Sequence, residues 1–174
     1  MNKIESTAVN LLKKHDLFDY PVDLPKLVQS LDIKMIPHEF DDDVSGMLII
    51  DDNQVTLGYN VRDGKERKRF TIAHELGHYV LHGNKNKLFL DKKSVYFRNN
   101  INSANKKQEI EANRFAAAIL MPTELLVKHI EQKIDFYDSL EEEEAIEKIA
   151  FEFKVSKISM TYRLVNLGMI EKNF

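Results

Sequence analysis

Two histidines and a glutamate stand at a spacing that favours metal chemistry. The run His74-Glu75-Leu76-Gly77-His78 fits the pattern HExxH, which binds zinc when it lies on a helix. Four residues advance a helix by about 400°, so His74 and His78 share one face and can both reach a single ion. Glu75 lies on the flank of that face, where its carboxylate can take a proton from water instead of binding the metal. We therefore expect His74 and His78 to be metal ligands and Glu75 to be catalytic.

A zinc site that hydrolyses a substrate needs a third protein ligand and an open fourth position. His82 falls on the same helical stripe, but it lies about 6 Å beyond His78 along the helix axis, which is too far for one ion. We interpret His82 as a pocket group or outer partner, with a plain packing or capping role as the alternative. Gly77 costs a helix about 1 kcal/mol relative to Ala, and close approach of another backbone is its expected reason.

The segment 109–113 supplies the candidate third ligand. Glu109, Ala112 and Asn113 share one face of a predicted helix, whose small alanine would let that helix approach the first one closely. Glu111 points about 200° away from Glu109. We favour Glu109 as the ligand, while Glu111 remains the alternative, and we expect Asn113 to hydrogen-bond a ligand histidine.

The elements that must hold these residues follow from periodicity and capping signals. A helix is predicted from Lys65 to His82, because Asp63 and Glu66 fit a capping box and Gly83 can end the helix. The other predicted elements are, in chain order, helices within 4–18 and 21–31, strands at 33–36, 45–50 and 55–60, a long loop over 84–104 with room for a short helix or strand near Val95, helices at 103–121 and 123–130, and two helices over 145–153 and 159–167.

These elements predict a single α+β domain that is rich in helix. We expect an N-terminal helical pair, a small three-stranded antiparallel sheet, and an HExxH helix packed on the helix that carries Glu109. The last two helices have a helix-turn-helix look. We place the metal-binding core at residues 1–135 and a C-terminal helical subdomain, packed on that core, at residues 136–174.

Composition restricts the classes of protein that remain. The chain has 174 residues, with 25 Lys and Arg against 28 Asp and Glu, for a net charge of -3. This balance removes the main electrostatic argument for a dedicated nucleic-acid binder. Cysteine is absent, so a metal must be held by His, Asp or Glu. The apolar runs are far shorter than the roughly 20 residues of a membrane span, and no signal-peptide pattern opens the chain. We expect a cytoplasmic protein.

Two segments together resemble a known family. They read RFTIAHELGHYVLH at residues 69–82 and EIEANRFAAAILMP at residues 109–122, and the pair is similar to the ImmA/IrrE metallopeptidase family. The resemblance covers nearly the whole chain. It extends through Pro21-Val22-Asp23, Ser45-Gly46-Met47-Leu48, Gly58-Tyr59-Asn60, Val155-Ser156 and Tyr162-Arg163-Leu164.

The resemblance implies a zinc-dependent endopeptidase that cleaves a helix-turn-helix transcriptional repressor, commonly encoded beside it, and so relieves repression of phage, mobile-element or stress-response genes. It assigns His74, His78 and Glu109 to the metal and Glu75 to catalysis. One zinc ion is implied, and the ligand types would also admit Mn²⁺ or another divalent ion.

The peptide-hydrolysis hypothesis needs a donor for the developing oxyanion and an edge for the substrate. His82, Tyr79 and Tyr96 are the candidate donors. The strand that ends at Gly58-Tyr59-Asn60 is a candidate edge on which a substrate segment could add as a further strand.

Two other functions remain as alternatives. One is a DNA-binding regulator that uses the C-terminal helices, although five basic against four acidic residues from position 144 onward leave little charge to neutralise phosphates. The other is a non-cleaving toxin or interaction partner of a helix-turn-helix regulator, with a structural zinc site. Such a site would normally close its fourth position with protein. We expect a repressor protein as the partner, with no membrane contact and no direct binding of nucleic acid.

Overall fold

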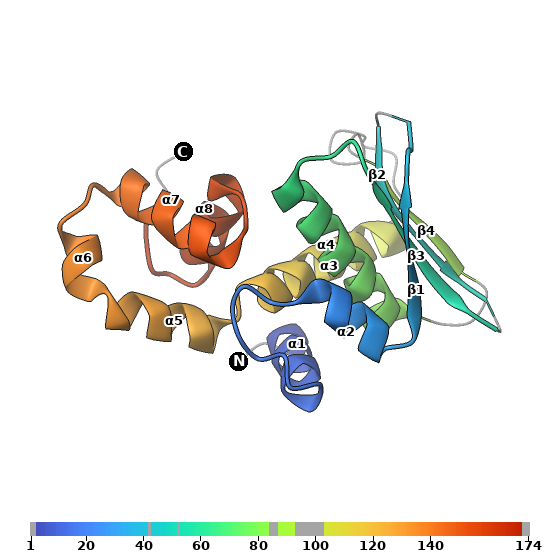
Figure 1. Ribbon diagram of the computed structural model, residues 1–174, viewed down its shortest axis with the longest axis horizontal. Helices are drawn as coiled ribbons and strands as arrows, with labels where there is room; N and C mark the ends of the chain where they lie inside the picture. The colour runs from blue at the N-terminus through green and yellow to red at the C-terminus, as the bar shows by residue number, and fades with distance from the viewer. Residues whose placement is uncertain (1–2, 42, 52, 84–86, 93–102, 172–174) are drawn as a thin grey trace.

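The computed structural model describes residues 3–41, 43–51, 53–83, 87–92 and 103–171. The helices are α1 (Lys3–Lys14), α2 (Leu24–Ser30), α3 (Lys65–His82), α4 (Ser103–Leu120), α5 (Thr123–Gln132), α6 (Ile134–Asp138), α7 (Glu142–Phe153) and α8 (Lys157–Asn166). The strands are β1 (Ile33–His38), β2 (Val44–Ile50), β3 (Val55–Asn60) and β4 (Lys87–Lys92). Helices α1 to α4 lie on one side of the sheet, and α5 to α8 extend away from it (Figure 1). The fold is α+β and helix-rich, as expected.

The sheet differs from the predicted one. In the described part of the chain it has four strands in the order β1-β3-β2-β4. Strand β2 pairs antiparallel with β3 and β4, whereas β1 pairs parallel with β3. The prediction of three antiparallel strands is therefore wrong in strand number and in the direction of β1. Local alternation identifies a strand but not its neighbour, and the usual preference for pairing consecutive strands fails here because β3 inserts between β1 and β2.

Strand β4 lies in the segment that the sequence predicted to be a loop. Its side chains alternate: Phe89 and Asp91 face the protein, while Leu88 and Leu90 are 60% and 46% exposed. Because its sequence contains no β-branched residue, propensity gives little sign of a strand, and pairing with β2 decides the conformation. The element expected near Val95 lies outside the described residues.

Helix α3 occupies the centre of the molecule. It packs on β2, β3, β4 and α4 and ends at Gly83, whose N–H donates to the carbonyl of Tyr79 at 3.0 Å. At its start the capping residue is Gly64, and no side chain makes a cap hydrogen bond there. The capping box predicted from Asp63 and Glu66 is therefore wrong.

The close approach expected at Gly77 is present between α3 and α4. A Cβ added to Gly77 would lie 3.0 Å from both the Cα and the carbonyl oxygen of Ala112. Real Cβ atoms rarely come so close to backbone, so only glycine fits this crossing without displacing α4. The contact brings the two helices that carry the candidate metal ligands against each other.

One hydrophobic cluster joins the sheet to helices from both ends of the chain. It includes Leu12 of α1, Leu48 of β2, Phe115 of α4 and Leu164 of α8. The division predicted at residue 135 stays a prediction, and that residue lies within α6. None of the helices in the described part of the chain combines the length and apolarity needed to cross a bilayer.

Helices α7 and α8 lie close to their predicted positions. Lys154 ends α7 with a φ of 52° in the left-handed region, and the hydroxyl of Ser156 accepts a hydrogen bond from the backbone N–H of Ser159 at the start of α8. The connection is therefore short and well capped. A helix-turn-helix role for this pair stays a prediction.

We predict that Gly77→Val lowers the free energy of unfolding by about 3 kcal/mol, because the added carbons must push α4 away from α3. Gly64→Val is the matched control. An added Cβ at Gly64 has its nearest contact at 3.9 Å, so the cost should be about 1 kcal/mol or less. Urea denaturation measures both values, and equal stability of the two variants would contradict the close contact.

Candidate metal centre

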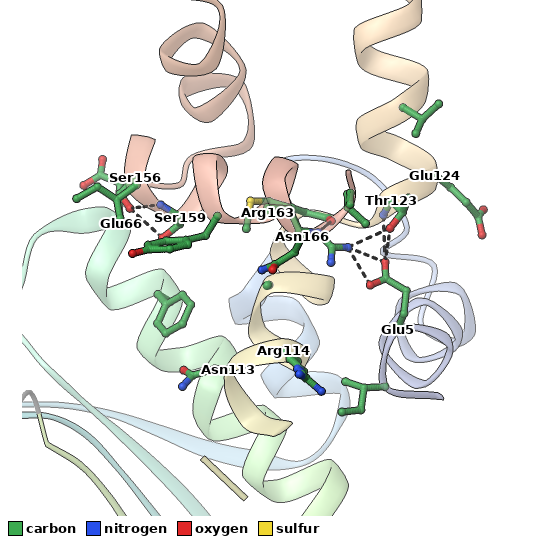
Figure 2. Close-up of a pocket in the computed structure, with 18 of the residues that line it drawn as sticks. Glu5, Glu66, Asn113, Arg114, Thr123, Glu124, Ser156, Ser159, Arg163 and Asn166 are labelled. Carbon is green, nitrogen blue, oxygen red and sulfur yellow. Dashed lines mark hydrogen bonds and ion pairs between the residues drawn. The ribbon is translucent and has the colours of Figure 1, made fainter. Parts of the chain in front are cut away.

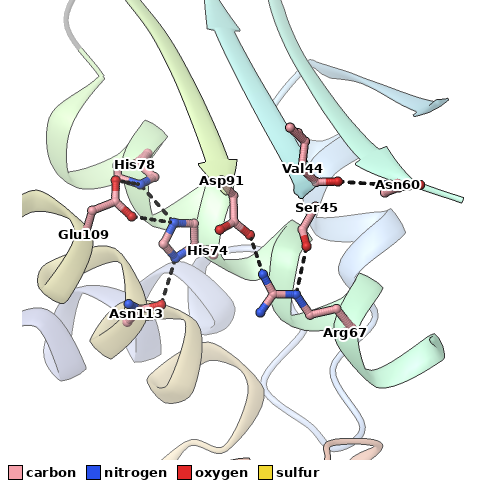
Figure 3. A network of polar contacts seen from close by, with 9 residues as sticks. All are labelled: Val44, Ser45, Asn60, Arg67, His74, His78, Asp91, Glu109 and Asn113. Carbon is pink, nitrogen blue, oxygen red and sulfur yellow. Dashed lines mark hydrogen bonds and ion pairs between the residues drawn. The ribbon is translucent and has the colours of Figure 1, made fainter. Parts of the chain in front are cut away.

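Three side chains from α3 and α4 converge on one point. His74 and His78 are buried on α3, and Glu109 of α4 is 32% exposed. Glu109 Oε2 lies 3.3 Å from Nε2 of His74, and its Oε1 lies 3.2 Å from Nε2 of His78. The two Nε2 atoms are 3.0 Å apart, and one ligand atom from each residue lies within 4.8 Å of the others. Figure 3 shows the three side chains pointing toward one another.

These residues fit a divalent metal ion. Nδ1 of His74 lies 3.0 Å from Oδ1 of Asn113, and when Nδ1 carries the proton that it donates there, the Nε2 lone pair faces the cluster. Two imidazole nitrogens and a carboxylate oxygen aimed at one point are the donor set that zinc accepts. Burial would raise the pKa of Glu109, but hydrogen bonds and charge from His74 and His78 outweigh it and lower that pKa to about 2.

Glu75 lies beside this cluster and is fully buried. Within the described residues neither of its carboxylate oxygens has a hydrogen-bond partner. Burial raises the pKa of Glu75 well above its ordinary value, and the negative charges of Asp91 and Glu109 raise it further. A carboxylate with a raised pKa is a better proton acceptor. The backbone of β2 closes one side, since a Cβ added to Gly46 would lie 3.1 Å from Oε1 of Glu75.

A second polar network, which sequence reasoning missed, ties α3 to the sheet next to Glu75. The guanidinium of Arg67 donates to Asp91 of β4 at 3.0 Å and to the hydroxyl of Ser45 of β2 at 3.1 Å (Figure 3). Asp91 is 6% exposed and Ser45 is fully buried. The ion pair offsets the charge of Asp91 close to Glu75. The sequence offered only a weak signal for this network, the short apolar run Leu88-Phe89-Leu90 before Asp91.

Aromatic rings bound the two histidines on their outer sides. Phe89 of β4 stacks on His78 with ring centroids 4.4 Å apart, and Phe70 lies 6.3 Å from His74 in a stacked orientation. Such contacts restrict the orientation of the imidazole rings. Phe89 was not among the residues that the sequence singled out.

The structure places the remaining sequence candidates away from the three ligand atoms. His82 lies 3.5 Å from Glu111 through its Nε2, and its ring centroid is 5.9 Å from that of His78. Burial and the charge of His78 lower the pKa of His82. Tyr79 is half-buried against the hydrophobic core, and Tyr96 lies outside the described residues. The two acids of the 109–113 segment therefore separate, with Glu109 at the cluster and Glu111 at His82.

Comparison with known proteins identifies the family. A peptidase family described as the IrrE N-terminal-like domain matches residues 28–165. The chain belongs to the ImmA/IrrE family, which confirms the resemblance noted in its sequence.

A relative and a solved structure show how far this likeness extends. The chain is 27% identical over 120 residues to "uncharacterized immunity region protein 2" of Bacillus phage phi105, and the match covers 68% of each protein. A structure named as a transcriptional regulator of Mycobacterium tuberculosis superposes with a TM-score of 0.63 at 14% identity, over 99% of this chain. The chain spans 49% of that regulator. At this identity the second likeness concerns the fold alone.

We predict that the zinc content of alanine variants identifies Glu109, and not Glu111, as the third metal ligand. Wild type and Glu111→Ala should retain about one ion per chain after dialysis, whereas Glu109→Ala should lose most of it, because Glu109 lies against Nε2 of His74 and His78 while Glu111 pairs with His82. Inductively coupled plasma mass spectrometry measures the content. Loss of zinc in Glu111→Ala alone would transfer the ligand role to that residue.

We predict that Asn113→Ala weakens zinc binding by about 10- to 100-fold without removing a ligand, because the ring of His74 loses the partner that orients it. Competition with a chelator gives the affinity. Asn113→Asp, which keeps an acceptor oxygen, should bind at least as tightly as wild type. Equal affinity in wild type and Asn113→Ala would show that the bond to His74 does not support the site.

Proposed function

We propose that this chain is a zinc-dependent endopeptidase that cleaves a helix-turn-helix transcriptional repressor in the cytoplasm and so relieves repression. One observation carries the proposal: the buried carboxylate of Glu75 lies next to a cluster of two histidines and Glu109, on a chain of the ImmA/IrrE family. Structural zinc sites fill all four positions with protein. A three-residue cluster with an adjacent carboxylate supports a catalytic site.

The residues of the chain divide the work of peptide hydrolysis. A divalent ion held by His74, His78 and Glu109 would supply Lewis acidity, which activates water and polarises a carbonyl group. Glu75 accepts the proton of the attacking water and then delivers it to the leaving nitrogen. The burial that raises the pKa of Glu75 favours this temporary protonation. Arg67 holds Asp91 and β4 in place beside it.

The sequence suggested the strand that ends at Asn60 as the edge on which a substrate segment adds, and the strand order contradicts this suggestion. The strand ending at Asn60 is β3, which lies between β1 and β2 and has both edges paired. In the described part of the chain β4 is an end strand, and its Phe89 stacks on His78. We propose that an extended segment around the scissile bond pairs with β4, because an end strand offers unpaired backbone groups next to the metal ligands.

A repressor is the favoured target for two reasons. The phage relative is named as an immunity-region protein, which supports a connection with a repressor system. In addition, the helical pair of the DNA-binding alternative has little excess positive charge, because residues from 144 onward carry five basic against four acidic residues, and this disfavours contact with phosphates. We therefore propose that the partner is the regulator protein itself.

We predict that Glu75→Gln lowers cleavage by about 100-fold or more while zinc stays bound, because the proton acceptor is lost and the ligands are kept. The test is co-expression with the helix-turn-helix regulator encoded beside the gene, followed by intact mass measurement of the regulator. Glu144→Gln, an exposed glutamate of α7, is the matched control and should cleave as wild type does.

A discrete fragment with wild type and the control, absent with Glu75→Gln, is the expected result. Fragmentation that persists in Glu75→Gln would refute the mechanism. An intact regulator that co-purifies with all three proteins would instead support the non-cleaving interaction partner.

A further inference from the structure

A large cavity lies between the metal-bearing helices and the C-terminal helix α8. Its volume is about 1420 Å³, and its walls come from α1, α3, α4, α5 and α8. Figure 2 shows its polar side chains, with Asn113 and Arg114 on one side and Ser159 and Asn166 of α8 opposite. Sites for small molecules usually measure about 300–1000 Å³. The space is therefore of a size that suits a segment of polypeptide.

One end of the cavity is lined by two residues that contact the candidate ligand His74. Phe70 and Asn113 both line it, and both also contact His74, through the stacked ring and through the hydrogen bond to Nδ1. A molecule in the cavity would lie beside the residues that orient this ligand. The cavity thus adjoins the candidate site through these two residues, while the candidate ligands and Glu75 are not among the residues that line it.

Two arginines hold the C-terminal helices in place and keep the cavity open. Arg163 of α8, 8% exposed, donates to both carboxylate oxygens of Glu5 at 2.7 and 2.9 Å and to the carbonyl of Met121 at 3.0 Å. Arg69 of α3 donates to the carbonyl of Lys154, just before α8, at 3.1 Å. The bonds of Arg163 are buried and charge-assisted, and bonds of this kind are strong and directional. The groove is therefore built before any partner binds.

The walls of the cavity expose apolar side chains that a soluble surface would normally cover. Ile158 and Tyr162 of α8 are 69% and 55% exposed, and Ile110 of α4 is 43% exposed on the other side. Charged side chains of both signs surround them. These are Glu66, Arg114, Lys128 and Glu131. An apolar strip with a mixed charged rim matches a segment that is itself amphipathic.

The walls also determine the conformation of that segment. The lining residues lie mostly on helices, whose interior backbone N–H and C=O groups are bonded within each helix, so an inserted chain meets few backbone partners apart from the N–H groups at the starts of α3, α5 and α8. A segment that leaves water for an apolar groove must then satisfy its own backbone groups. Only a helix does this within a single segment. An extended segment is better served by the edge of β4.

We propose that the cavity binds an amphipathic helix of the protein substrate, with its apolar face against Ile158 and Tyr162. This inference rests on the proposed peptidase function and names how the substrate is held: a helix docked on α8 while the scissile segment lies at the metal. It gives the C-terminal helices a role in recognising protein.

The test measures binding without catalysis, in the Glu75→Gln protein. The probe is a fluorescein-labelled synthetic helix of about 20 residues, built from Leu, Ala, Glu and Lys, with leucines at i, i+3, i+4 and i+7 spacing. A peptide of the same composition, with its leucines scattered around the helix, is the reference. Fluorescence anisotropy should give binding of the amphipathic helix at least about tenfold tighter than of the scattered peptide.

Two matched substitutions locate the binding. Ile158→Asp should weaken binding by about tenfold or more, because it places a charge on the apolar wall. Phe151→Asp, on α7 outside this cavity and 82% exposed, should leave binding unchanged. Both sites are exposed, so both variants should fold, and thermal unfolding verifies this. Absence of binding, equal binding of the two peptides, or equal weakening by both variants would overturn the inference.

Failure of this inference and failure of the proposed function are distinguishable. If wild type and Ile158→Asp cleave the neighbouring regulator equally and bind the helix equally, the peptidase proposal stands and the docking site is wrong. If the helix binds in an Ile158-dependent way while wild type cleaves nothing, the docking site stands and the peptidase proposal is wrong.

Discussion

The candidate site depends on the close crossing of α3 and α4 at Gly77 and Ala112. A glycine in the middle of a helix is unfavourable by itself, but here it lets the backbone of α4 approach to within contact distance. Glu109 lies three residues before Ala112 on the same face of α4, and Asn113 is the residue directly after Ala112. The crossing thus brings the third candidate ligand to the histidines and the orienting amide to His74.

Electrostatics at this crossing explains why the site is built from so many elements. Burial raises the pKa of Glu75, and the negative charges of Asp91 and Glu109, which lie close by, raise it further. Arg67 offsets one of these charges by pairing with Asp91. A divalent cation would offset the remaining excess at the point where the histidine nitrogens meet the carboxylate of Glu109. The sheet takes part because β4 supplies Asp91 and β2 closes over Glu75.

The C-terminal helices belong to the same physical arrangement. Arg163 and Arg69 connect them to α1 and α3 through short hydrogen bonds, and their core residues join the single hydrophobic cluster. Their nearly balanced charge and the apolar wall of α8 suit contact with protein better than contact with phosphates. The candidate metal centre and the proposed recognition surface therefore rest on the same hydrophobic core.

The sequence alone determined the local features of this protein. The i, i+4 spacing of His74 and His78, the helix that carries them and the glycine that lets a neighbour approach all depend on short-range helical geometry, and each was predictable. The tertiary structure decided what depends on contacts between distant segments: the parallel pairing of β1, the existence of β4, the pair of Arg67 with Asp91, and the separation of Glu109 from Glu111. Periodicity describes the faces of one element. Which face meets which partner is settled only when the elements pack together.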